Sequence, residues 1–209
     1  MYIKEFTGRQ VTGMKLRIHG TEAQVTALGS GYRFAVWVQG CLRRCPGCIS
    51  PDTWNMEEGY DRDTAELAEE ILNSGCDGIT ISGGEPFLQA EALSDMLTRV
   101  RKKKDIGVII YTGNTLEELK AQHSEYIERL LALCDLLVDG AYVEEQNDGK
   151  NLRGSSNQRA LALTDRYQKE ALDYGTRDAY VELFVHEDKI RMVGIPSKEM
   201  LDRMKKIHW

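Results

Sequence analysis

The chain has 209 residues, of which 42% are hydrophobic, 29% charged and 8% aromatic, and its formal net charge is -6. These values exclude a disordered chain and a fibrous repeat, and the length suits one domain with a substantial core. The negative charge argues against a broad nucleic-acid surface, and no uninterrupted apolar run approaches a membrane span. Because the N-terminus also lacks a signal-peptide pattern, we expect a single cytoplasmic domain over 1–209 with no nucleic-acid or membrane partner.

Apolar runs of strand length recur along the chain. A first segment over 14–20 predicts an early strand. The buried runs that follow it lie at 34–38, 78–82, 106–111 and 135–139. The last three begin about 28 residues apart, which is the repeat of a strand and a helix, so they predict an α/β fold with parallel strands.

Helical patterns separate these runs. Their ranges are 64–74, 89–104 and 115–133. The first is expected to stop at Gly75, and the basic run 101–104 is expected in the last turn of the second, where its charges favour the helix dipole. The third begins at Thr115, which has capping-box spacing to Glu118, and a break is expected near His123.

The end of the chain is less regular. The polar, Gly-rich segment 144–158 predicts a long loop, and a loop of that length in a compact domain is often functional. A hairpin is predicted over 180–195, turning near Glu187 and Asp188. A last helix is predicted from Ser197, with its apolar face formed by Met200, Leu201, Met204 and Ile207. We expect a core over about 14–160 and an extension over 161–209 that adds packing rather than a partner surface.

An unusual segment follows each of the four buried runs. The cluster Cys41–Cys48 follows the first, and "SGGEP" (82–86) follows the second. "TGN" (112–114) and "DGAY" (139–142) follow the other two. In parallel α/β folds the loops after successive strands converge on a ligand, so the functional site is predicted at the carboxyl ends of the strands.

Three of the five cysteines lie within eight residues, at Cys41, Cys45 and Cys48. In a reducing compartment this spacing indicates metal binding or redox chemistry rather than disulfides. The other two, Cys76 and Cys134, are expected to be buried small apolar residues. A structural zinc site needs four ligands, and the four histidines are scattered. A [4Fe-4S] cluster held by three cysteines leaves one iron open for chemistry, so we favour a cluster over zinc.

The spacing C-x-x-x-C-x-x-C after one predicted strand, with Gly83-Gly84-Glu85-Pro86 after the next, resembles the radical S-adenosylmethionine (SAM) superfamily. Alone, the glycine segment would suit a chemically silent strand-to-helix turn equally well. The resemblance implies a partial, open β/α barrel that binds a [4Fe-4S] cluster and SAM. It implies that the cluster ligands are Cys41, Cys45 and Cys48. The SAM contacts that we expect are Gly47, Cys48, Ile49, Gly83, Gly84, Glu85 and, from its position at the rim, Thr112.

Residues 28–160 further resemble the activating proteins of anaerobic ribonucleoside-triphosphate reductase. The most discriminating segment is Arg153–Gln158, and Gly47 before the third cysteine is also typical of them. The resemblance implies that a reduced cluster cleaves SAM to a 5'-deoxyadenosyl radical, which removes a hydrogen atom from a glycine of the large reductase subunit. It also implies a low-potential electron donor of the flavodoxin or ferredoxin type, and it requires no catalytic acid or base.

The sequence leaves two alternatives open. One is a radical SAM enzyme with a different target, such as another glycyl radical enzyme, a peptide or a small molecule. The other is a non-catalytic iron-sulfur or zinc-binding module.

Overall fold

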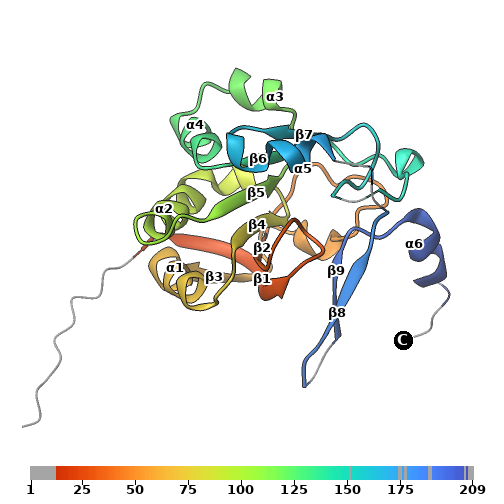
Figure 1. Ribbon diagram of the computed structural model, residues 1–209, viewed down its shortest axis with the longest axis horizontal. Helices are drawn as coiled ribbons and strands as arrows, with labels where there is room; N and C mark the ends of the chain where they lie inside the picture. The colour runs from red at the N-terminus through yellow and green to blue at the C-terminus, as the bar shows by residue number, and fades with distance from the viewer. Residues whose placement is uncertain are drawn as a thin grey trace, which may run out of the picture.

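The computed structural model describes residues 13–150, 152–173, 176, 178–187, 190–204 and 206. A seven-stranded sheet has the order β3-β1-β2-β4-β5-β6-β7 (Figure 1). Its strands are β1 (Lys15–Val25), β2 (Arg33–Val38), β3 (Tyr60–Asp63), β4 (Gly78–Gly83), β5 (Gly107–Tyr111), β6 (Leu136–Asp139) and β7 (Arg159–Ala162). The four central strands β2, β4, β5 and β6 run parallel to one another, as predicted. The sheet is open, because β3 and β7 are its two edges.

The flanks of the sheet add antiparallel pairings to the predicted parallel strands. β1 pairs antiparallel with both β2 and β3, and β7 pairs antiparallel with β6. β1 continues to Val25, beyond the predicted 14–20, and the strands β3 and β7 were not predicted at all. Both have four residues and include charged ones, "YDRD" and "RALA", so neither carries the apolar run by which a buried strand is recognised.

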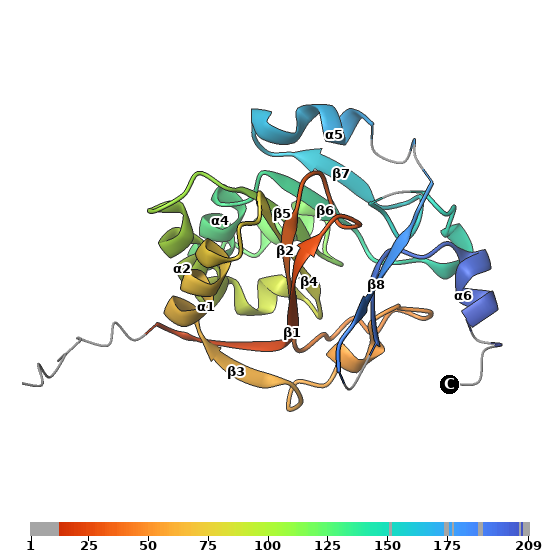
Figure 2. The same cartoon turned by 60° about the horizontal axis from the view of Figure 1, so that its bottom comes forward.

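Helices cover one face of the sheet (Figure 2). They are α1 (Thr64–Asn73), α2 (Ala90–Arg101), α3 (Leu116–Ala121) and α4 (Glu125–Ala132). The main core forms where α1, α2 and α4 pack against the sheet, through residues such as Ile71, Leu93 and Leu130 against Ile79 and Ile81. These apolar positions recur every three to four residues along each helix, so a single face is buried.

The helix boundaries differ from expectation in two places. α2 ends at Arg101, so Lys102–Lys104 lie beyond the helix and not in its last turn. The N–H groups of Lys103 and Lys104 both bond to the carbonyl of Val100, which closes the helix as a turn. The predicted break near His123 is confirmed, because His123 has a φ of 48° and separates α3 from α4. Cys76 and Cys134 are buried, as expected.

Asp63 caps α1. Its carboxylate accepts hydrogen bonds from Ala65 N (2.8 Å) and Glu66 N (3.2 Å), and from Gly13 N (2.7 Å) on the chain before β1. Burial opposes ionisation of this carboxylate, but the three N–H groups outweigh burial and hold the pKa of Asp63 below its ordinary value. One side chain therefore both starts the helix and ties it to β1.

We expect Asp63→Ala to lower the free energy of unfolding by about 1–2 kcal/mol at pH 7, the usual cost of a lost N-cap. Because the pKa of Asp63 is lowered in the folded state, this contribution is complete above the ordinary Asp pKa of about 3.9 and is lost as the pH falls through the lowered value. Urea unfolding at pH 7 and at pH 3 checks both points. Asp63→Asn is the control, since it keeps an acceptor for the helix and should lose much less at pH 7.

The C-terminal extension forms the predicted hairpin and helix. After η4 (Asp165–Tyr167) and α5 (Gln168–Leu172), β8 (Val181–Val185) pairs antiparallel with β9 (Ile190–Gly194). α6 (Lys198–Met204) closes the described chain. Asp188 of the predicted turn and Ile207 of the predicted helix face lie outside the described residues. The hairpin lies on the side of the sheet opposite to α1, α2 and α4 (Figure 2).

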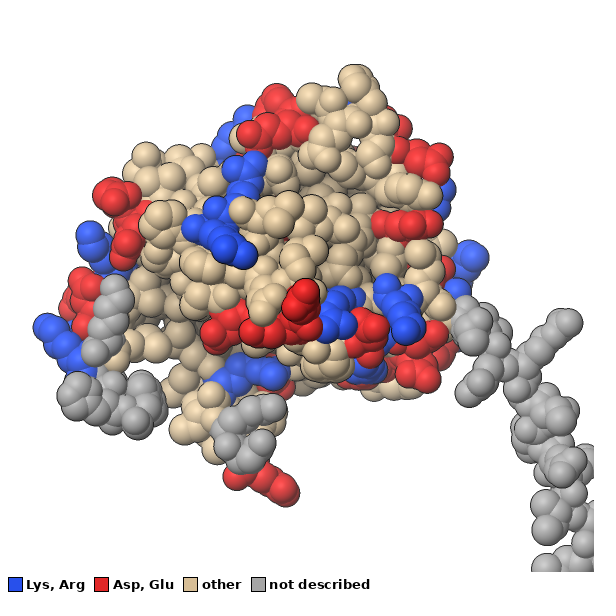
Figure 3. Space-filling model, turned by 180° about the vertical axis from the view of Figure 1, so that it is seen from behind, with Lys and Arg blue, Asp and Glu red and all other residues tan. Residues whose placement is uncertain are grey.

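Acidic and basic side chains are interspersed on the face opposite to that of Figure 1 (Figure 3). The described residues of this face therefore form no extended field of a single sign. Within the described ranges, no helix has both the length and the apolar character needed to cross a bilayer.

Candidate cluster and cofactor site

A cavity of about 240 Å³ opens at the carboxyl ends of the central strands, where the sequence predicted a site. Its lining comes from the loops after β2, β4, β5 and β6 and from the C-terminal extension. The structure brings all nine predicted site residues to this one cavity: Cys41, Cys45, Gly47, Cys48, Ile49, Gly83, Gly84, Glu85 and Thr112.

The cysteine loop follows β2 and is held at both ends. Gly40 N donates to Thr53 O (2.8 Å) and Cys41 N donates to Trp54 O (3.1 Å), so the loop returns beside η1 (Pro51–Thr53). Within the loop, Cys48 N donates to Cys45 O (3.1 Å) and the intervening Gly47 has a φ of 73°. This positive φ favours glycine, and a side chain at Gly47 would also have to displace the Glu144 carboxylate.

The three thiols are free and partly exposed. Partial burial is the main reason that the pKa of Cys48 is raised; hydrogen bonds from Ser50 and Trp54 oppose this, and the Cys45 and Cys41 sulfurs add to it. The positive charge of a bound metal would offset the repulsion between the sulfurs and would stabilise them as thiolates. By contrast, complete burial raises the pKa of Cys134 well above its ordinary value, which keeps that thiol protonated.

The donor set fits a cluster better than a single ion. Among the described residues, no three His, Cys, Asp or Glu side chains converge closely enough to share one metal ion. A zinc ion would require its ligands to converge at about 2.0–2.3 Å from one point. In a cubane each thiolate binds a different iron, so three separated cysteines around one cavity are compatible with a [4Fe-4S] cluster.

The Gly83-Gly84-Glu85 segment packs its backbone directly against the start of the cysteine loop. Gly84 N donates to Val38 O and Glu85 N donates to Gly40 O, both at 2.8 Å. A Cβ atom at Gly84 would lie 2.2 Å from Gly40 O. The glycines thus let two of the predicted ligand-binding segments pack into one wall. This packing explains why glycine is needed here even without a bound ligand.

We expect Gly84→Ala to lower the free energy of unfolding by about 1–3 kcal/mol, the usual cost of overpacking, because the added Cβ must displace a backbone carbonyl. Gly20→Ala is the matched control. Its Cβ would meet only the end of the flexible Arg191 side chain, at 3.1 Å. Denaturant unfolding of both variants checks the difference, and an equal loss in the two would contradict the packing argument.

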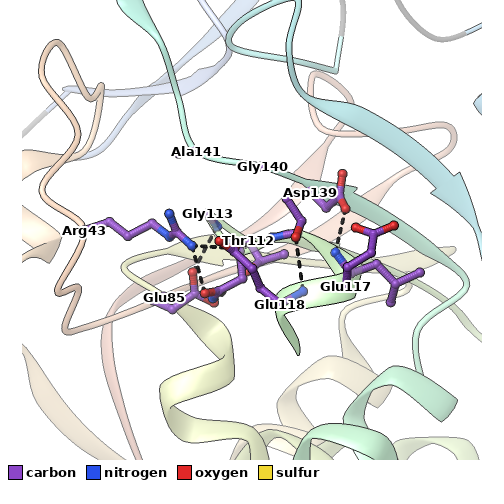
Figure 4. A network of polar contacts seen from close by, with 12 residues as sticks. Arg43, Glu85, Thr112, Gly113, Glu117, Glu118, Asp139, Gly140 and Ala141 are labelled. Carbon is purple, nitrogen blue, oxygen red and sulfur yellow. Dashed lines mark hydrogen bonds and ion pairs between the residues drawn. The ribbon is translucent and has the colours of Figure 1, made fainter. Parts of the chain in front are cut away.

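Glu85 is a buried carboxylate at the centre of a polar network (Figure 4). Its Oε1 accepts from Thr112 Oγ1 (2.8 Å) and Phe87 N (3.1 Å), and its Oε2 accepts from Gly113 N (2.9 Å). Burial raises the pKa of Glu85 in spite of these donors. The Glu85 side chain therefore joins the loop after β4 to the loop after β5.

Arg43 links the cysteine loop to the same network (Figure 4). Its Nη2 donates to Asn114 Oδ1 (3.0 Å) and to Glu118 Oε2 (2.8 Å), and Glu118 also completes the predicted capping box with Thr115. Arg43, which lies between Cys41 and Cys45 in the sequence, is thus held in place by residues at the N-terminus of α3. The sequence showed the capping box but gave no sign of this contact.

The described residues of 140–150 and 152–158 contribute one wall of the cavity. Gln158 is central to it: its Oε1 accepts from Gly154 N (2.8 Å) and its Nε2 donates to Gly140 O (2.8 Å). Asn157 Nδ2 donates to Ala141 O (2.8 Å), and the buried Ser155 accepts from Val143 N through Oγ (3.1 Å). The residues of "RGSSNQ" thus hold the loop after β6 in shape, and Gly154 and Gln158 also line the cavity.

Two parts of the cavity were missed by the sequence reasoning. The hydroxyl of Tyr111, at the end of β5, is buried without a hydrogen-bond partner among the described residues. Burial raises the pKa of Tyr111, so its hydroxyl stays protonated and can donate to a bound ligand. The C-terminal extension also lines the cavity, through Met192–Pro196 and Leu201. Neither could be found from the sequence. Tyr111 simply ends an apolar strand, and the hairpin is far from the other site residues in the chain, so neither has a local motif.

Comparison with known proteins identifies the family. A sequence model described as a 4Fe-4S single cluster domain matches residues 27–161. An anaerobic ribonucleoside-triphosphate reductase-activating protein of Vibrio cholerae is 36% identical over 141 residues, which are 62% of this chain and 87% of that protein. The chain belongs to the radical SAM family of glycyl radical activases.

Two further activases match over longer stretches. A pyruvate formate-lyase-activating enzyme of Listeria monocytogenes is 30% identical over 190 residues, 87% of this chain and 70% of that enzyme. The pyruvate formate-lyase 1-activating enzyme of Escherichia coli is 35% identical over 153 residues, 69% of this chain and 59% of that enzyme. A crystal structure of QueE from Escherichia coli aligns with 48% of this chain and 53% of that chain at 18% identity and a TM-score of 0.41, too low a similarity to support a conclusion.

Membership in this activase family makes the protein an enzyme whose cofactors are a [4Fe-4S] cluster and SAM. It rules out the alternative of a non-catalytic module. The cavity fits this cofactor pair, since it presents three thiols, a glycine backbone wall and an unpaired buried hydroxyl.

Proposed function

We propose that this activase installs a glycyl radical on the large subunit of anaerobic ribonucleoside-triphosphate reductase. The observation that carries the proposal is the convergence of all nine predicted site residues on one cavity, built from four successive strand ends. The target is supported by the 36% identity to the Vibrio cholerae reductase-activating protein, 87% of which this chain covers.

Within this function we assign Cys41, Cys45 and Cys48 as the cluster ligands. When bound, the reduced cluster and SAM supply the one-electron chemistry that removes a hydrogen atom from a glycine Cα. The backbone of Gly47–Ile49 and of Gly83–Glu85 is assigned to hold SAM. In the second segment the N–H groups of Gly84 and Glu85 already bond to the protein, and the Glu85 carbonyl accepts from Leu88 N (3.1 Å). The carbonyl groups of Gly83 and Gly84 are therefore the atoms we assign to the ligand.

Thr112 is assigned a positioning role. Its hydroxyl donates to Glu85 and accepts from Asn114 N (3.1 Å), so it acts on the SAM-binding backbone through the Glu85 carboxylate. Tyr111 is assigned as a direct donor to the bound cofactor pair or to the substrate, because its hydroxyl has no other use among the described residues. The remaining task of the cavity wall is to exclude water from a reactive species. A flavodoxin or ferredoxin is the electron donor that we propose.

A second target deserves equal testing. The Listeria monocytogenes pyruvate formate-lyase-activating enzyme matches 190 residues of this chain, against 141 for the reductase-activating protein, so its similarity includes more of the chain. Pyruvate formate-lyase is therefore the alternative substrate.

The test is anaerobic reconstitution with iron and sulfide, chemical reduction, and addition of SAM with either the reductase large subunit or pyruvate formate-lyase. A glycyl radical signal in electron paramagnetic resonance that requires the reductase and all other components supports the proposal. A signal with pyruvate formate-lyase alone moves the function to the second target. Formation of 5'-deoxyadenosine without a radical on either protein contradicts both.

A further inference from the structure

The two faces of the β8–β9 hairpin differ in their contacts. The pairs Leu183–Met192 and Val185–Ile190 lie on one face, and Glu182–Val193 and Phe184–Arg191 lie on the other. This assignment follows from the alternation of side chains along a strand and from the register of the hairpin. The extension was expected to add packing, yet one of its faces is packed and the other is not.

The face with Phe184 and Val193 is anchored to the body of the protein. Both side chains join an apolar cluster with Val25, Leu28 and Ala35. The Glu182 carboxylate accepts hydrogen bonds from the N–H groups of Thr26 (2.8 Å) and Ala27 (2.7 Å) and from the Thr26 hydroxyl (2.8 Å).

Arg191 adds to the anchor from the second strand. Its guanidinium lies over the Trp37 ring, 5.6 Å from the centroid, and bonds to Thr21 O and to Glu22 (3.2 Å). Both strands are thus tied to the body of the protein on this side, and the opposite face is left exposed towards the turn of the hairpin.

That opposite face is apolar and exposed. Leu183 is 62% exposed, Val185 is 78% exposed and Ile190 is 56% exposed. All three lie on the same face of the hairpin, between its middle and its turn. Contiguous apolar groups of this kind on a protein surface usually mark a binding site.

The exposed face is continuous with the cavity. Met192 pairs with Leu183 on the same face, and Met192 and Gly194 line the cavity. The apolar surface therefore runs from the cavity mouth along the hairpin. A macromolecular substrate that presents a backbone glycine to the cavity must cover the surface beside the mouth, and the hairpin is such a surface.

We propose that Leu183, Val185 and Ile190 form the docking surface for the glycyl radical enzyme, contacting the chain of that enzyme next to its target glycine. The inference rests on the proposed function, because it takes the occupant of the surface to be the protein whose glycine enters the cavity. The surface acts in substrate binding and not in SAM cleavage, since its residues lie outside the cavity.

The test uses the full reconstituted enzyme with Leu183→Glu, Val185→Glu, Ile190→Glu and the triple variant. We expect the KM for the glycyl radical enzyme and its Kd by biolayer interferometry to rise at least about tenfold in the triple variant, as for loss of interface anchors. SAM cleavage without protein substrate should stay within about twofold of wild type, because side chains outside the cavity do not stabilise the transition state of that reaction. Tyr126→Glu is the matched control: it is a 38% exposed residue of α4, on the other side of the sheet.

The other possible outcomes contradict either the docking surface alone or the proposed function as well. If wild type activates its partner and the hairpin variants match it, the docking surface is wrong and the proposed function stands. If the variants instead lose self-association in analytical ultracentrifugation with no change in the KM for the partner, the surface joins two copies of this chain. If wild type cleaves SAM but neither binds nor activates the two offered enzymes, the proposed function and the docking assignment both fall.

Discussion

Replacing any one of Cys41, Cys45 and Cys48 with serine is expected to abolish glycyl radical formation and to lower SAM cleavage by at least about three orders of magnitude, since the one-electron step has no other source in the protein. The loop supplies three thiols to one cavity, whereas Cys76 and Cys134 are buried outside its lining. A missing ligand therefore has no substitute nearby, and the expected loss is of the cluster itself.

Iron and sulfide analysis, visible absorbance and electron paramagnetic resonance of the reconstituted variants measure that loss directly. Cys76→Ala and Cys134→Ala are the matched controls, because both residues are buried away from the cavity lining. They should keep full cluster content and cost about 1 kcal/mol of stability, as ordinary core substitutions do. A Cys45→Ser protein with wild-type iron content and cleavage rate would remove Cys45 from the ligand set.

The site could be predicted from the sequence because the local backbone geometry at several of its positions restricts the residue type. Gly84 must be glycine to approach Gly40 O, and Gly47 must be glycine to turn between two cysteines, so both leave a visible motif. The central strands were equally visible, since strands buried on both faces read as continuous apolar runs.

What the sequence did not show depends on contacts between distant residues. Met192 lines the cavity because Glu182 is held by Thr26 and Ala27, more than 150 positions earlier in the chain. Arg43 reaches Glu118 across two loops. In both cases the residue type is ordinary for a surface, and its role follows from the tertiary fold alone.

Among the described residues, Arg33 is the largest fully buried side chain; it was not identified from the sequence, because it occupies the first position of an otherwise apolar strand. Its guanidinium donates to the Thr80 hydroxyl (2.5 Å), the Tyr167 hydroxyl (2.8 Å) and the carbonyl of Ile79 (2.5 Å). It also donates to Ser30 O (3.2 Å) and Gly107 O (3.3 Å), and its cation lies over the Tyr167 ring. All these acceptors are neutral, so the arginine serves to join β2, β4, β5 and η4 at the end of the sheet opposite to the cavity.

Arg33→Leu is therefore expected to lower the free energy of unfolding by about 3 kcal/mol or more, which corresponds to a fall in Tm of roughly 6–12 °C for a chain of this size. Relief of the buried charge favours the variant, but several buried oxygens lose their donor at about 1–3 kcal/mol each, and leucine leaves part of the volume empty. Arg62→Leu is the matched control, because Arg62 makes a surface ion pair with Glu70 (2.6 Å), and such pairs contribute at most about 1 kcal/mol. Calorimetry of the two variants decides the matter: equal Tm values would mean that the buried hydrogen bonds of Arg33 contribute no more than a surface ion pair.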